Sequence, residues 1–287
     1  MSYDILELFK WTILASMAAS SVLAFLGVQL ASKAKSVQVL AMSQGAILGV
    51  LIGMAASGFS VHEGSELDTH FLPLFFSSIV AFLVSVFGEY ITKDIRSSKN
   101  TYYVSIFSFL MAFSYFVSAL FPALESHMTQ VFFGDLATLT NTDSMLTIAF
   151  SLICFSFFLI MKNKIINDSF EDAVFGVEKQ YFSKESKLEN FFISLLSTVF
   201  ICFSIQFLGL LFTLSCLFIP TAIFAYSRCG SINSHLIFCI LASVISSFVG
   251  VVWSLFNTSL STVPCVVLVM VALSSFLVLI SKGMSHD

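Results

Sequence analysis

The segment from Val61 to His70 contains the densest set of potential metal ligands in the sequence. Two histidines and three acidic residues occur there within nine positions, namely His62, Glu63, Glu66, Asp68 and His70. Imidazole nitrogens and carboxylate oxygens are suitable ligands for zinc and manganese. The segment therefore predicts either a divalent metal site or an acidic, solvated loop that docks a binding protein.

A later segment adds two residues of the same chemistry. His127 and Asp135 would complete a metal site only if the two segments converge in space. The sequence has no H-E-x-x-H pair, no G-x-S-x-G elbow and no two carboxylates inside one apolar run. We therefore expect a protein that is not an enzyme, and no cofactor bound to this chain.

The composition places these residues in a membrane protein. Of the 287 residues, 57% are hydrophobic and 10% are charged, and the mean hydropathy is +0.96. Soluble domains carry about 25% charged residues. The net charge of −4 argues against nucleic acid as a partner, because no basic surface exists to neutralise phosphates.

Long apolar runs predict an all-α, polytopic fold with about nine transmembrane helices. The runs are too continuous for strands that alternate apolar and polar residues, and helices are the other structure that spans lipid. The weakest division lies at Gln206–Gly209, so that eight spans are the alternative. The predicted spans are 8–30, 37–58, 72–92, 102–121, 144–161, 190–206, 208–227, 234–254 and 262–281.

Basic residues predict the orientation of these spans. All of the 13 lysines and arginines except Lys10 fall on one side of the nine-span topology. Positive charge is retained on the cytoplasmic side. We therefore expect an N-terminus outside and a cytoplasmic C-terminus, with outer loops at 59–71, 122–143 and 255–261.

Two charged segments belong to the predicted cytoplasmic side. Glu89 lies near the end of a span, where we expect it to pair with Lys93 at i, i+4. The loop 162–189 contains a capped amphipathic pattern in which Phe170, Val174 and Val177 share one face. The pattern fits either a helix on the membrane surface or a helix that docks into a partner ATPase.

Four segments resemble the permease family of bacterial ABC importers for zinc, manganese and iron. They are Ala41–Gly49, Phe133–Leu136, Asp172–Val177 and Gly209–Pro220, and their order and spacing extend the likeness over about residues 10–280. The resemblance implies one transmembrane permease domain over residues 1–287 in the inner membrane of a bacterium. It also implies import of a divalent metal ion, zinc or manganese and otherwise iron.

The resemblance further implies partners and a coupling helix. The sequence has no Walker A motif, so ATP and Mg²⁺ are expected in a separate cytoplasmic ATPase present in two copies. A second copy of the chain and an extracytoplasmic substrate-binding protein complete the assembly. The coupling helix is expected near 168–178, with contacts from Phe170, Glu171, Asp172, Ala173, Val174, Gly176 and Val177.

By the same resemblance, Ser43, Gln44, Gly49 and Pro220 would line the substrate pathway. The family carries an Asp and, four positions later, a His in its second span, where this sequence has Leu40 and Gln44. Leucine cannot ligate a metal, and Gln44 offers only a neutral carbonyl oxygen. A metal complex or another small solute is therefore the alternative substrate, and a secondary transporter is the alternative mechanism.

Overall fold

The protein is described by a computed structural model in which every regular element of the described residues is a helix. The structure describes residues 7–57, 66–92, 99–134, 136, 139–175, 185–225, 232–257 and 260–283. Eight of the described helices are long and apolar enough to cross a membrane. The prediction of an all-α, polytopic fold is confirmed for this part of the chain.

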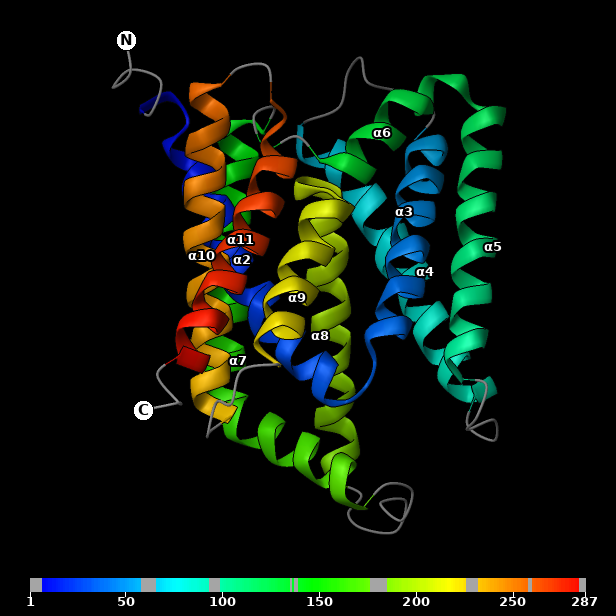
Figure 1. Cartoon of the computed structure of the whole chain (residues 1–287). Helices are drawn as coiled ribbons and strands as arrows, with labels where there is room; N and C mark the ends of the chain where they lie inside the picture. The colour runs from blue at the N-terminus through cyan, green and yellow to red at the C-terminus, as the bar shows by residue number, and fades with distance from the viewer. Residues whose placement is uncertain are drawn as a thin grey trace. The chain divides into compact units, whose positions relative to one another are not determined.

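The helices form two compact units, which we name the α2 unit and the α3 unit (Figure 1). The α2 unit comprises Met1–Lys33, Gly134–Phe182 and Leu211–Asp287, and the α3 unit comprises Ala34–Phe133 and Ser183–Leu210. The α2 unit contains α2 (Lys10–Ser32), α7 (Asn141–Phe175), α9 (Leu210–Phe224), α10 (Ile232–Phe256) and α11 (Thr262–Gly283). The α3 unit contains α3 (Ser36–Ala56), α4 (Glu66–Thr92), α5 (Lys99–Leu120), η1 (Pro122–Leu124), α6 (Glu125–Phe133) and α8 (Glu185–Leu208).

In the α2 unit, α2 packs against both α7 and α10, and α10 also packs against α11. Stacking of Phe25 on Phe158, with ring centroids 5.8 Å apart, joins α2 to α7. Cys154, Cys216, Cys239 and Cys265 of this unit are buried and act as small core residues.

In the α3 unit, α3 is the central helix and packs against α4, α5 and α8. Three glycines on α3 allow a close antiparallel approach to α4. A Cβ atom on Gly49 would lie 2.5 Å from the Ser77 Cα, and one on Gly53 would lie 2.6 Å from the Pro73 Cα. Gly45 faces Val84 less tightly, at 3.1 Å. These glycines form a stripe of small residues on α3, which permits the close contact with α4.

The predicted break at Gln206–Gly209 is confirmed. Helix α8 ends at Leu208, α9 begins at Leu210, and Gly209 between them has φ 90°. Glycine adopts this left-handed conformation without the clash that a Cβ atom would cause. Helix α9 has 15 residues and a length of about 22 Å, against an apolar bilayer core of about 30 Å. Among the described helices, eight therefore have a full spanning length, and α9 is a shorter apolar helix.

Several of the predicted loops contain helix. The loop expected to begin at 162 is part of α7, which continues to Phe175 without a new start near Asp168. No glycine or proline interrupts residues 162–175, so the helix has no local reason to stop there. Figure 1 shows the C-terminal part of α7 turning away from the direction of its N-terminal part. The expected outer loop 122–143 likewise contains η1 and α6.

Replacement of Gly49 by alanine should destabilise the protein more than replacement of Gly45 by alanine. The added methyl group at position 49 meets backbone atoms of Ser77 and Phe76, which cannot rotate away, whereas at position 45 it meets the movable Val84 side chain. Overpacking costs about 1–3 kcal/mol, and we expect Gly49→Ala near the upper limit. Thermal unfolding in detergent would measure this difference, and equal melting temperatures would contradict it.

Candidate functional site

The buried middle of α3 carries Gln44, the polar residue that the resemblance places on a substrate pathway. Its side chain is 1% exposed, and its Oε1 atom has no hydrogen-bond partner among the described residues. The Oε1 atoms of Gln29 and Gln38 are in the same state, and a water molecule or a ligand can supply the missing partner of such an atom. The neighbouring Ser43 is also buried, but its hydroxyl donates to the Leu40 carbonyl at 2.8 Å. Of Ser43 and Gln44, only Gln44 therefore has a side-chain oxygen that is available to accept a hydrogen bond.

Gly49 and Pro220 have packing roles that the structure makes explicit. Gly49 lies against the α4 backbone, as described above. Pro220 lies inside α9 and has no amide hydrogen for the Cys216 carbonyl one turn earlier. The next carbonyl, that of Leu217, accepts a hydrogen bond from the Thr221 hydroxyl at 2.9 Å. A Cβ on Gly27 of α2 would lie 2.0 Å from this carbonyl oxygen, so α2 covers α9 one turn before the proline.

The predicted outer metal site falls largely outside the described residues. His62, Glu63 and Asp135 lie outside them. Glu66, Asp68 and His70 belong to the first turns of α4, which begins at Glu66 and not after residue 71 as expected. His127 is exposed on α6. No group of three or more potential ligands occurs within the part of the chain that the structure describes, so the outer site stays a prediction.

The predicted ATPase contacts lie at the end of α7. Phe170, Glu171, Asp172, Ala173 and Val174 are in its last turns. Gly176 and Val177 lie outside the described residues. The contacts with an ATPase stay predictions, but they now belong to the end of a long helix instead of a separate short one.

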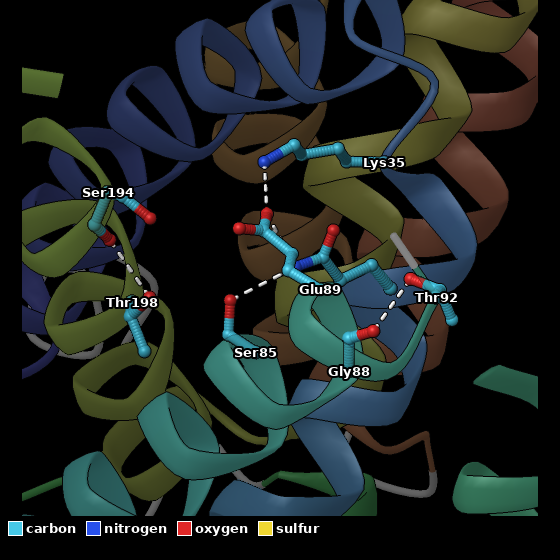
Figure 2. Close-up of polar contacts among 8 residues, drawn as sticks. Lys35, Ser85, Gly88, Glu89, Thr92, Ser194 and Thr198 are labelled. Atoms are coloured by element: carbon cyan, nitrogen blue, oxygen red, sulfur yellow. Dashed lines mark hydrogen bonds and ion pairs between the residues drawn. The ribbon is translucent and has the colours of Figure 1, made fainter. Parts of the chain in front are cut away.

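A polar cluster closes one end of the α3–α4 interface (Figure 2). The ammonium group of Lys35 pairs with the Glu89 carboxylate at 2.5 Å. The Gln38 amide donates to the Ser85 hydroxyl at 3.0 Å and to Glu89 Oε1 at 3.2 Å. Figure 2 shows Lys35 and Glu89 pointing toward one another from the two helices. We name these four residues the α3–α4 polar cluster.

The sequence suggested a different partner for Glu89. We expected Lys93, four residues later on the same helix, but Lys93 lies outside the described residues. The partner in the structure is Lys35, 54 residues away in sequence. The order of the spans does contain a signal for the pairing of Lys35 with Glu89. Two helices joined by a short loop run antiparallel, which brings the start of the first span close to the end of the second.

The segment that resembles an outer-loop motif of the metal permeases is anchored to α11. Gly134 has φ 70°, and the following Leu136 is fully buried. The Leu136 amide donates to the hydroxyl of Thr262 at 3.2 Å. Thr262 is the first residue of α11, so the motif fixes the entry of that helix.

Comparison with known proteins agrees with this geometry. Residues 5–282 match the model of the ABC 3 transport family. The high-affinity zinc uptake system membrane protein ZnuB of Buchnera aphidicola is 26% identical over 249 residues, which cover 85% of each chain. The structure of PsaBC from Streptococcus pneumoniae in complex with Fab is similar in fold, with a TM-score of 0.73 and 14% identity. The likeness covers 98% of this chain and 94% of that one.

Loss of the Thr262 hydroxyl should destabilise the α2 unit. In Thr262→Val the buried Leu136 amide loses its acceptor, at a cost of about 1–3 kcal/mol. Thr262→Ser keeps the hydroxyl and serves as the matched control. Thermal unfolding in detergent would separate the two variants. A Thr262→Val protein as stable as Thr262→Ser would show that this hydrogen bond contributes nothing measurable.

Proposed function

Because the chain belongs to the ABC 3 transport family, we propose that it is the membrane permease subunit of an ABC importer for a divalent metal ion, zinc or manganese. A family match over residues 5–282 carries the transport assignment. The site observation that supports a pathway in this chain is the buried, unpartnered amide oxygen of Gln44. The zinc uptake protein named above supports the choice of substrate.

The energy source in this proposal is another polypeptide. The sequence contains no G-x-x-x-x-G-K-[ST] motif, so the nucleotide site belongs to a cytoplasmic ATPase. Two ATPase copies, a second copy of this chain and an extracytoplasmic binding protein would complete the importer. The bacterial inner membrane is its proposed location, with the N-terminus outside and the C-terminus in the cytoplasm.

The proposed pathway uses Gln44 as a neutral oxygen donor. An ion that leaves water needs replacement ligands, because an uncompensated charge in an apolar environment is strongly disfavoured. Leu40, one turn before Gln44, cannot supply the missing ligand. A bare ion would therefore depend on ligands from elsewhere, whereas a metal complex brings its own. Import of such a complex or another small solute is the second candidate function.

Uptake of free ions should depend on Gln44 and on the outer histidines. We expect ATP-dependent uptake of radiolabelled zinc or manganese in cells that carry the whole importer, weakened by Gln44→Ala and by His62→Ala/His70→Ala. Ser197→Ala is a suitable control, because Ser197 is buried in α8 and its hydroxyl bonds its own helix at the Ile193 carbonyl, at 2.7 Å.

An added variant separates the two candidate substrates. Leu40→Asp/Gln44→His introduces a carboxylate and an imidazole at i, i+4, where both can approach one ion. If the natural cargo is a complex, this variant should gain free-ion uptake that the unmodified importer lacks. If the unmodified importer ignores both ions but a loaded binding protein stimulates its ATPase, the free-ion proposal is wrong and the second candidate is supported.

Deletion of residues 168–178 should abolish association with the ATPase while membrane insertion is retained. Phe170→Ser/Val174→Ser tests the same surface without shortening the chain, since these residues lie one helical turn apart. Asn163→Ala, at an exposed position on α7, is the control. The measurement is co-purification of permease and ATPase. Native stoichiometry in both the deletion and the double variant would overturn the assignment of the coupling surface.

A further inference from the structure

We propose that the α3–α4 polar cluster sets the register of α3 against α4 and thereby positions Gln44 in the membrane. Lys35 and Glu89 are positioning residues in this account, and they make no contact with the substrate. The part that concerns Gln44 rests on the proposed function, whereas the part that concerns register does not.

The inference begins with the period of the α3–α4 interface. Gly45, Gly49 and Gly53 repeat every fourth residue on α3, and Ala41 continues the series. On α4 the facing residues Pro73, Ser77 and Ala81 repeat with the same spacing, and Ser85 continues it. Both series consist of small residues.

Equal periods leave the register of the two helices poorly defined. A shift of α4 by one helical turn would replace each pair of small residues with another such pair. Gly49, for example, would face Ala81 or Pro73 in place of Ser77. Close packing of backbones stabilises helix association in lipid, but here it would stabilise the shifted registers almost as well. A contact that is unique along the interface is therefore needed to select one register.

The polar cluster supplies that unique contact. Lys35 and Glu89 are the charged residues of the interface, and their side chains are 33% and 47% exposed. A one-turn shift would remove the carboxylate from Lys35 and the Ser85 hydroxyl from Gln38, which is 3% exposed. The shifted register offers no replacement for this charge-assisted contact or for the hydrogen bonds of Gln38.

Neighbouring contacts hold α4 but do not replace the cluster. The ring of Tyr103 in α5 packs on Gly88, where a Cβ atom would lie 2.5 Å from the ring. The Cys202 thiol in α8 lies 3.7 Å from the Ser77 carbonyl oxygen of α4. These contacts fix α4 against α5 and α8. Among the described residues, the polar cluster contributes an ion pair and hydrogen bonds that tie α3 itself to α4.

Register can be measured without transport by cysteine crosslinking. Gln38→Cys/Ser85→Cys reports the register of the structure, because the native side chains are in hydrogen-bond contact. Gln38→Cys/Ala81→Cys reports a register shifted by one turn. Both pairs would be introduced into the full-length permease with its ATPase in membranes, oxidised, and scored by blocking the remaining thiols. Single-cysteine variants account for the native cysteines.

We expect crosslinking at 38/85 and little at 38/81 while Lys35 and Glu89 are intact. Lys35→Ala or Glu89→Gln should lower the 38/85 yield and raise the 38/81 yield. The exchange Lys35→Glu/Glu89→Lys should restore the original pattern, which simple loss of packing would not do. Glu89→Gln keeps the shape of the side chain and remains informative if Lys35→Ala does not fold.

Uptake then tests the positioning of Gln44. With residues 38, 81 and 85 native, uptake should fall several-fold in Glu89→Gln and recover in the charge exchange. Unchanged crosslinking in both Lys35→Ala and Glu89→Gln would overturn the role in register. Shifted crosslinking with undiminished uptake would overturn the positioning role. If instead Gln44→Ala itself leaves uptake unchanged, the proposed pathway is wrong, while the crosslinking result still decides the register.

Discussion

The α3 unit depends on the contact between the α3 and α4 backbones at Gly49 and Gly53. Apolar side chains gain little from leaving lipid for a helix interface, so close packing and polar contacts must hold such helices together. Glycines provide that packing because no Cβ atom separates the two backbones. With α4 on one side and α5 and α8 also in contact, α3 is buried over most of its length. Gln38, Ser43 and Gln44 of α3 are thereby withdrawn from solvent.

This burial gives Gln44 its significance. On a peripheral helix a glutamine would find water or headgroups, but on α3 its amide oxygen has no partner among the described residues. Ser43, one position earlier, avoids the same cost through a bond to its own helix. The two neighbours show that burial alone does not leave a polar group unsatisfied. The longer glutamine side chain carries its acceptor away from the α3 backbone, so its own helix does not satisfy it.

The fold could be predicted from the sequence to the extent that its signals are local. Apolar runs predicted the helices, and the glycine at 209 predicted the break between α8 and α9. The continuation of α7 to Phe175 differs from the predicted end at 161, because the charged residues there end only the apolar part of the helix. For Glu89, local spacing favoured Lys93, but the contact with Lys35 comes from a tertiary pairing that spacing does not contain. The orphaned oxygen of Gln44 likewise becomes evident only when its surroundings are known.

The contacts that hold α3 in place are separate from the side chains proposed to line the pathway. A permease can therefore keep this fold while the chemistry of the proposed pathway changes. The contacts that hold α3 involve glycines, a terminal ion pair and hydrogen bonds at the end of the helix. None of these contacts uses the side chain of Leu40 or Gln44. Substitutions at those two positions therefore alter what α3 offers to a solute and leave these named contacts with α4 in place. In the proposed importer, a neutral Leu40 and Gln44 shift the need for charge compensation from the permease to the cargo. The same α3–α4 frame can then serve either a bare ion or a ligated one.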